Sequence, residues 1–164
     1  MSIRPIFIIL FLVLVSPAVH GQESQFETSS HISSNSVNVF AQDKNGYMWI
    51  GTERGLNRYN GYTYKTYFAN KELNGLYSDN ITAMTFDSKD RLWIGTDFGI
   101  TYLKDGIFHH HTEPVYNRIS KLLDYGDEHI LALGKDGFVK FRKEGLVAVA
   151  VFSDPGSSYA DKAI

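Results

Sequence analysis

The sequence DKNGYMWIGT, Asp43–Thr52, recurs as DSKDRLWIGT, Asp87–Thr96, and this repetition is the strongest indication of the architecture. Trp49 and Trp93 lie 44 residues apart, and the match continues without a gap beyond each quoted segment. A third copy, over 119–147, keeps a Lys-Asp-Gly-Phe turn but has neither the Trp nor the Gly-Thr pair. The chain is therefore organised as copies of one unit, and its period suits either propeller blades or some helical repeats.

Strand chemistry decides between these two architectures. Each copy divides into four short runs rich in aromatic and β-branched residues, bounded by turn residues. The runs are 37–42, 47–52, 56–59 and 62–68 in the first copy, and 81–86, 91–96, 100–103 and 107–111 in the second. Asn60-Gly61 is typical of a hairpin turn because both residues tolerate positive φ. No window keeps a helical period for three turns, so each copy is predicted to be a four-stranded antiparallel blade of a β-propeller.

Strand alternation places the side chains of each blade. Phe40 is predicted to face away from Val39 on an inner strand that is packed between blades on both sides. The two tryptophans fall on the second strand, where a large ring fills the space between blades. Gly51 and Gly95 would permit close backbone approach there. The fourth strand is expected to be outermost and wet, with Lys65 and the run 109–111 on it.

The fold class is therefore all-β: a partial β-propeller of about three four-stranded antiparallel blades. We expect blade one at 35–68, blade two at 80–112 and a degenerate blade three at 119–152. Closed propellers need about four blades or more, so we expect the chain to be the N-terminal part of a larger propeller. The alternative is association that buries the open faces of the end blades. Residues 25–27 are expected to complete the last blade of the remaining part.

The N-terminus predicts export. An apolar run, 6–15, follows Arg4, and small residues precede Gln22, so 1–21 is predicted to be a cleaved signal peptide and 22–164 the extracytoplasmic chain. An uncleaved membrane anchor is the alternative, which the shortness of the run disfavours. The absence of Cys excludes disulfides, thiolate metal sites and a lipoprotein. A net charge of −2 offers no basic surface for nucleic acid.

The residues 43–67, DKNGYMWIGTERGLNRYNGYTYKTY, closely resemble the two-component regulator propeller repeat. The second copy fits the same pattern, with Asp90 in place of the turn Gly and Leu103 in place of Tyr. The resemblance extends over about 22–150. It implies the periplasmic sensor region of a hybrid two-component histidine kinase that responds to glycan fragments. It also implies that the remaining blades, membrane helix and kinase belong to a longer protein anchored in the inner membrane, for which a homodimer is conceivable.

The motif residues are predicted to be structural. They are Asp43, Trp49, Gly51 and Thr52 in the first copy and Asp87, Trp93, Gly95 and Thr96 in the second. The two aspartates resemble metal ligands or catalytic acids, but Asp before a Gly-type turn ordinarily accepts backbone N–H bonds. Two histidines, His109 and His111, point the same way on a strand, yet a zinc site needs a third or fourth ligand. We therefore expect no metal and no cofactor.

Catalysis within this chain is not expected. The sequence has no Ser-centred elbow and no Cys nucleophile, and its carboxylates lie mainly in turns rather than in an evident pair. The kinase of the full-length family proteins is absent from this chain. A propeller enzyme that acts on glycans stays as the weakest alternative, and turnover of glycans would favour it.

Binding residues are expected where the long inter-blade connections and the second-to-third turns emerge, because long loops on a rigid scaffold collect binding groups. The candidate ligand contacts are Arg54, Asn74, Tyr77, Phe98, Tyr116 and Arg118. The leading hypothesis is a sensor segment that binds an oligosaccharide. The second is a secreted propeller scaffold for protein interaction. A transmembrane helix and kinase core encoded after Ile164 would favour the first, and a stop codon after more blades the second.

Overall fold

The computed structural model describes residues 26–70, 75–110, 118–126, 128–135, 137–144 and 147–153. Every regular element within them is a strand. The first sheet holds β1 (Phe26–Ser29), β2 (Val37–Gln42), β3 (Met48–Thr52), β4 (Gly55–Tyr59) and β5 (Tyr64–Tyr67). The second holds β6 (Ile81–Phe86), β7 (Leu92–Thr96), β8 (Gly99–Lys104) and β9 (Ile107–His110). The third holds β10 (Lys121–Tyr125), β11 (His129–Gly134), β12 (Gly137–Arg142) and β13 (Val147–Ser153). The predicted signal peptide, 1–21, lies outside the described residues.

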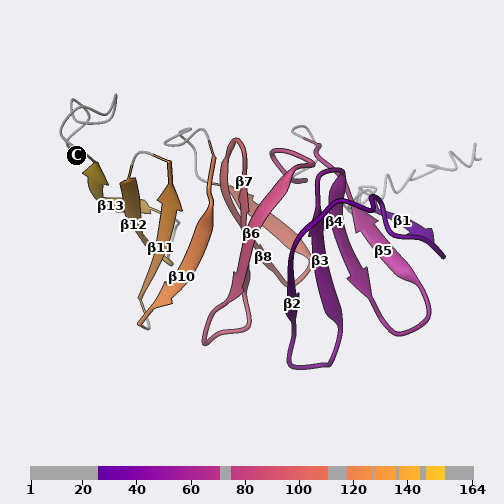
Figure 1. Ribbon diagram of the computed structural model, residues 1–164. Coiled ribbons are helices and arrows are strands. Elements are labelled where there is room, and N and C mark those ends of the chain that lie inside the picture. The colour runs from indigo at the N-terminus through magenta and orange to yellow at the C-terminus, as the bar shows by residue number, and fades with distance from the viewer. Residues whose placement is uncertain are drawn as a thin grey trace, which may run out of the picture.

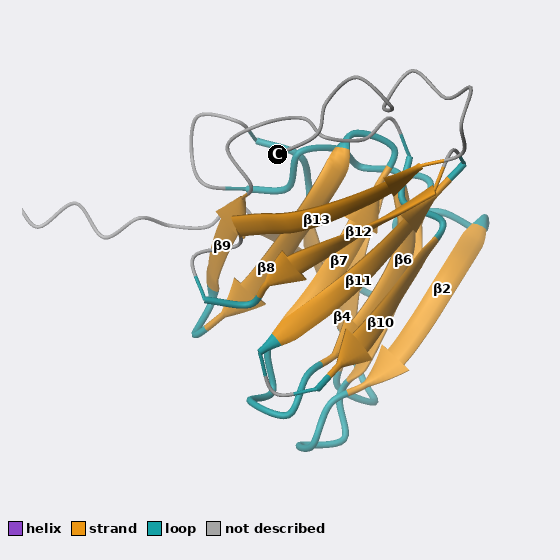
Figure 2. Cartoon of the chain, turned by 90° about the vertical axis from the view of Figure 1, so that its left-hand side faces the viewer, coloured by secondary structure: helices purple, strands orange, loops and turns teal. Residues whose placement is uncertain are grey.

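The three sheets are antiparallel meanders that lie side by side (Figure 1). Strands β2 to β5, β6 to β9 and β10 to β13 follow one another in sequence order across their sheets. Strands β2, β6 and β10 each lie at one edge of their sheet and are neighbours, since β2 contacts β6 and β6 contacts β10. Figure 2 shows the third sheet in front, with strands of the other sheets behind it. This arrangement confirms the predicted all-β, partial-propeller fold.

The first sheet has a fifth strand that corrects the expectation for residues 25–27. Strand β1 pairs antiparallel with β5, with Phe26 opposite Tyr67 and Ser29 opposite Tyr64, and so belongs to the first sheet rather than to a later blade. The physical reason is that the outer edge of β5 offers unpaired backbone groups, which a preceding extended segment can satisfy. The prediction that the fourth strand is outermost was therefore wrong for this sheet, and Lys65 on β5 is half-buried rather than wet.

Two cores fill the spaces between the sheets, and each contains one of the repeated tryptophans. Trp49, 5% exposed, packs between the first and second sheets with Leu56, Ile81 and Ile94. Trp93, 0% exposed, packs with Ala132, Val139 and Phe141 between the second and third sheets. The two rings occupy equivalent places in successive interfaces, so the same strand position supplies the main apolar filler each time.

The face of the first sheet that points away from the second is open. Phe40 on β2 is 69% exposed, although β2 was expected to be packed on both sides. Its counterpart one repeat later, Met84, is buried against the first sheet, and so is Ile94, the counterpart of Ile50. In the second sheet the equivalent positions, Met84 and Ile94, pack against the first sheet. In the first sheet these positions, Phe40 and Ile50, form the open face.

Candidate functional site

The repeated Asp-to-Trp segment folds into a hydrogen-bonded turn. In the first copy Oδ1 of Asp43 accepts the backbone N–H groups of Asn45 and Tyr47, at 2.9 and 3.0 Å. Its Oδ2 accepts the indole N–H of Trp49 at 3.0 Å. One carboxylate therefore shapes the β2–β3 turn and orients the ring that fills the core. Gly46, which closes this turn, has a positive φ of +85°.

The second copy buries the same arrangement and adds an ion pair. Asp87 accepts the indole N–H of Trp93 at 2.8 Å, and the same oxygen, Oδ2, accepts Nε–H of Arg91 at 2.6 Å. Burial raises the pKa of Asp87, but the hydrogen bonds from Trp93, Arg91 and Lys89 outweigh it and hold that pKa below its ordinary value. Asp90 adopts φ +57° at the position of Gly46, which shows that Asp replaces the turn Gly in the same backbone conformation.

The Gly-Thr pair serves the opposite end of the same strand. A Cβ on Gly51 would lie 2.5 Å from Cγ2 of Ile81 in the next sheet, so only Gly allows the two sheets to approach this closely. The hydroxyl of Thr52 donates to the carbonyl of Gly55 at 2.9 Å and accepts the N–H of Arg54 at 3.0 Å. Gly95 and Thr96 repeat both arrangements. The motif residues therefore hold turns and sheet spacing in each copy.

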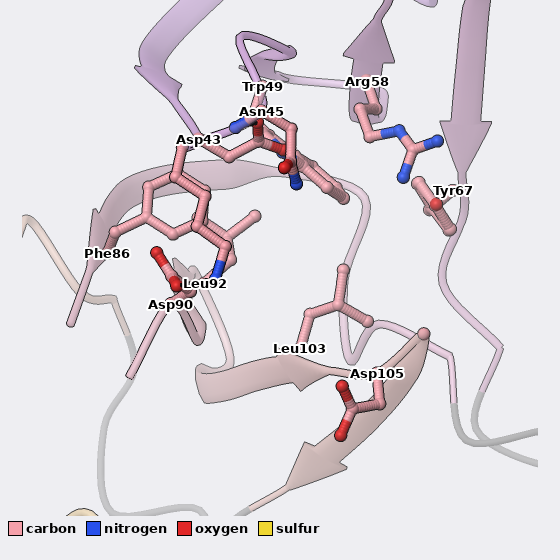
Figure 3. Close-up of a pocket in the computed structure, with 12 residues that line it drawn as sticks. Asp43, Asn45, Trp49, Arg58, Tyr67, Phe86, Asp90, Leu92, Leu103 and Asp105 are labelled. Carbon is pink, nitrogen blue, oxygen red and sulfur yellow. Dashed lines mark hydrogen bonds and ion pairs between the residues drawn. The ribbon is translucent and has the colours of Figure 1, made fainter. Parts of the chain in front are cut away.

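A cavity of about 270 Å³ opens between the first and second sheets, at the end where the short turns lie (Figure 3). Its rim comes from the β2–β3, β6–β7 and β8–β9 turns, and its floor comes from the aromatic and aliphatic core. The lining residues are Asp43, Lys44, Asn45, Trp49, Arg58, Tyr67, Phe86, Asp90, Leu92, Leu103, Asp105 and Gly106. The volume is just below the range of about 300–1,000 Å³ that is usual for ligand pockets.

The rim contains both bound and available polar groups. Lys44 and Asp90 form an ion pair across the two sheets. The guanidinium carbon of Arg58 lies 4.4 Å from the ring centroid of Tyr47 and 5.7 Å from that of Trp49. Among the described residues Arg58 has no carboxylate partner within ion-pair distance, and Asp105 has no cation. The mouth therefore offers a donor-rich cation and an acceptor-rich anion to a ligand.

One cation, Arg58, lines the side of the cavity formed by the first sheet, and a second, Lys65, is its neighbour on β5. Arg58 on β4 pairs directly with Lys65 on β5, so the two positive side chains share one face. Burial, with a smaller effect of Arg58, lowers the pKa of Lys65 from its ordinary value. Burial raises the pKa of Tyr67 beneath them, and Arg58 opposes that rise. Arg58 is thus the cation that lies next to the apolar floor of the cavity.

The predicted ligand contacts lie elsewhere. Arg54 and Phe98 occupy the second-to-third turns at the end of the sheets opposite the cavity, and Phe98 is 63% exposed. Tyr77 is half-buried, with its ring 4.2 Å from that of His110, and Arg118 is exposed just before β10. Asn74 and Tyr116 lie outside the described residues. The structure therefore places four of the six residues at the predicted end, and joins none of these four to the cavity.

The histidine run is less solvated than expected. His109 stacks on Tyr102 with ring centroids 4.5 Å apart, and Nδ1 of His110 lies 3.1 Å from the hydroxyl of Thr101. Both histidines are half-buried, because their rings pack against those of Tyr102 and Tyr77. His111 is outside the described residues. Within the described part of the chain, no group of three His, Cys, Asp or Glu side chains is placed to hold a metal ion.

The sequence reasoning missed the cavity residues Arg58, Asn45 and Asp105. The signal that could have found Arg58 is a difference between the copies. Tyr47 and Arg58 in the first copy are replaced by Arg91 and Tyr102 in the second, so the aromatic residue and the cation exchange positions. In both copies the cation lies beside the aromatic ring, at 4.4 Å in the first and 5.5 Å in the second.

Comparisons with known proteins agree with this geometry. Residues 31–54 and 78–98 match the family model described as the two component regulator propeller. A histidine kinase of Formosa agariphila is 33% identical over 72 residues, which are 41% of this chain and 5% of the kinase. This chain thus spans a small part of that relative. No helix long and apolar enough to cross a membrane occurs in the part of this chain that the structure describes.

Solved structures share the fold. The extracellular domain of a hybrid two-component system from B. thetaiotaomicron superposes with a TM-score of 0.60 at 21% identity, over 79% of this chain and 17% of that chain. PorZ, an essential surface component of the type-IX secretion system of Porphyromonas gingivalis, superposes with a TM-score of 0.52 at 14% identity. That match covers 71% of this chain and 21% of PorZ. These likenesses show the propeller architecture.

Proposed function

We propose that this chain, which carries two-component regulator propeller repeats, forms an extracytoplasmic ligand-sensing segment of a two-component regulator and responds to oligosaccharides. The observation that carries the proposal is that both family matches include the Asp-to-Trp turns or the strands they orient. The repeats therefore form the scaffold that the family match describes, and not merely strands of similar composition.

The proposal places the chain in a longer protein. Its kinase relative is about twenty times longer than the matched segment, since the match spans 5% of it. In the proposal, 1–21 directs export, the blades lie in the periplasm, and further blades, a membrane helix and a kinase core follow in the full-length protein. The extracellular location of the B. thetaiotaomicron domain supports this placement. The role assigned to this chain is recognition, with no catalytic step.

The first test reads the gene beyond the codon for Ile164. A transmembrane helix followed by a histidine kinase core is the expected result. A stop codon after additional blades would contradict the sensing role and favour a secreted scaffold for protein interaction.

The second test measures binding of neutral and acidic oligosaccharides to the full-length extracytoplasmic region by calorimetry. Saturable binding without turnover is expected. Release of shorter products would contradict the proposal and favour a glycan-active enzyme. Alanine variants of Arg54 and Phe98 test whether the predicted loop end makes the contacts, because both side chains project from turns of the rigid scaffold.

A further inference from the structure

We propose that the cavity between the first and second sheets binds a sugar ring that bears a carboxylate, with Arg58 as the group that holds the carboxylate. The choice of a sugar rests on the proposed function. The choice of this cavity and of an acidic ligand rests on the geometry of the described residues.

Arg58, the cation on the side of the cavity formed by the first sheet, favours an anion at that place. The guanidinium carbon of Arg58 lies 4.4 Å from the ring centroid of Tyr47, and the Arg58 side chain lines the cavity beside its aromatic floor. Arg58 forms no ion pair within the described residues. A ligand carboxylate on the guanidinium would supply the counterion that Arg58 lacks among these residues and would accept two parallel N–H bonds.

Two of the three carboxylates of the rim are already engaged by other groups. Asp43 already accepts three N–H groups, from Asn45, Tyr47 and Trp49. Asp90 is neutralised by its ion pair with Lys44. Asp105 alone is without a cation, and its exposed carboxylate is available to accept bonds from ligand hydroxyls.

The rest of the cavity suits one sugar ring. Trp49 and Tyr67 are stacked with ring centroids 5.8 Å apart and, with Leu103, form an apolar floor against which C–H groups can pack. The side chain of Asn45 at the rim supplies both a donor and an acceptor for hydroxyls. A cavity of about 270 Å³ limits the buried part of the ligand to about one ring.

The equivalent space between the second and third sheets is filled by charged side chains. Lys143 takes the place of Asp105, is 1% exposed, and pairs with Asp124, which takes the place of Phe86. Nη1 of Arg91 donates to the carbonyl of Lys143 at 3.2 Å and closes the same region. One interface of this repeat is therefore sealed by an ion pair and the other is left open.

The two tryptophans provide a direct test, because Trp49 lines the cavity and Trp93 lies in the sealed interface. The Trp93→Phe variant leaves only Trp49 to report, and the Trp49→Phe variant leaves only Trp93. Both proteins are titrated with D-galacturonate and D-glucuronate, and with D-galactose and D-glucose as neutral counterparts. A saturable change of fluorescence with at least one uronate is expected in Trp93→Phe alone. No response to either uronate, an equal response to the neutral sugars, or a response in Trp49→Phe would overturn the proposal.

Variants of the cavity then test its residues in the Trp93→Phe background. Arg58→Gln is expected to weaken uronate binding about tenfold or more, because it removes a charged hydrogen-bond donor. Arg142→Gln on the exposed side of β12 is the matched control and should leave binding unchanged. The double variant Phe86→Asp with Asp105→Lys copies the sealing pair of the third sheet and should abolish binding while the circular dichroism spectrum is kept. Undiminished binding in Arg58→Gln or in the sealed variant contradicts the proposal.

The outcome also separates this proposal from the proposed function. Oligosaccharide binding that calorimetry detects and that depends on Arg54 or Phe98, with no response of Trp49, would overturn the cavity proposal and leave the sensor role standing. Absence of binding to every neutral and acidic oligosaccharide tested would overturn both.

Discussion

The indole N–H of Trp93 donates to Oδ2 of Asp87 across 2.8 Å, and this carboxylate has no solvent-exposed surface. The matching bond between Trp49 and Asp43 measures 3.0 Å and lies beside the open cavity. In the buried copy the carboxylate also carries the ion pair with Arg91, whose side chain is 5% exposed. Asp87 therefore makes a buried ion pair in addition to its hydrogen bond with the Trp ring, whereas Asp43 makes the hydrogen bond without an ion pair to any described residue.

Asp87→Asn is expected to destabilise the protein more than Asp43→Asn. The first leaves the Arg91 guanidinium buried without its counterion, which ordinarily costs about 3–5 kcal/mol. The second weakens hydrogen bonds near solvent, at about 1–2 kcal/mol. Urea unfolding of the two variants beside the parent protein measures both losses. Equal losses would mean that the Asp87–Arg91 pair does not stabilise the second sheet.

Gly51→Ala is expected to cost about 1–3 kcal/mol through overpacking, because its Cβ would lie 2.5 Å from Cγ2 of Ile81. A double-mutant cycle with Ile81→Ala separates this clash from a general loss of strand stability. The alanine at 51 should cost less when Ile81 is already shortened. Strictly additive losses in urea unfolding would place the strain elsewhere than between the two sheets.

Exchanging Tyr47 and Arg58 should reproduce the arrangement of the second copy. Each single variant, Tyr47→Arg or Arg58→Tyr, removes the cation–π contact and is expected to lose about 0.5–2 kcal/mol. The double variant restores an aromatic ring beside a cation, and it brings Arg within reach of Asp43 as Arg91 is of Asp87. Thermal unfolding of all four proteins gives the coupling energy, and an additive double variant would show that the two positions do not interact.

Stability is expected to fall as the pH drops below about 6.5 because of His110. Burial, and to a lesser extent the neighbouring His109, lower the pKa of His110 below its ordinary value of 6.5, against an opposing backbone hydrogen bond with Gly75. Between the two pKa values the unfolded chain binds more protons than the folded chain, so acid favours unfolding. The loss of unfolding free energy between about pH 7 and pH 5 should shrink in His110→Asn but not in His31→Asn, whose side chain is exposed. An unchanged pH dependence in His110→Asn would refute this assignment.

The strands and core of this fold follow from local patterns. Alternation around Trp49 and Trp93, and the turn residues between the runs, are properties of neighbouring residues, and the structure places strands where those patterns do. The pairing of β1 with β5 could not be predicted in the same way. Residues 26–29 carry a signal for extended structure, but the choice among sheet edges depends on chain closure in three dimensions.

The cavity escaped prediction for a different reason. A comparison of repeats finds the residues that are the same in both copies, whereas the open interface depends on residues that differ between the copies. Asp105 and Lys143 hold equivalent positions, and only the packing of whole sheets reveals that one leaves a space and the other fills it. A pattern search that scores conserved positions passes over such a site.

The reciprocal placement of Arg and Tyr in the two copies has a consequence for folding. Strands β3 and β7 are nearly the same sequence, so a chain of such repeats risks pairing a strand with the wrong copy. If β7 paired with β4, Arg91 would meet Arg58 and two guanidinium groups would repel each other. The correct partners bring each cation to an aromatic ring. The exchange of Arg and Tyr between the copies therefore disfavours pairing of a strand with a strand of the other copy.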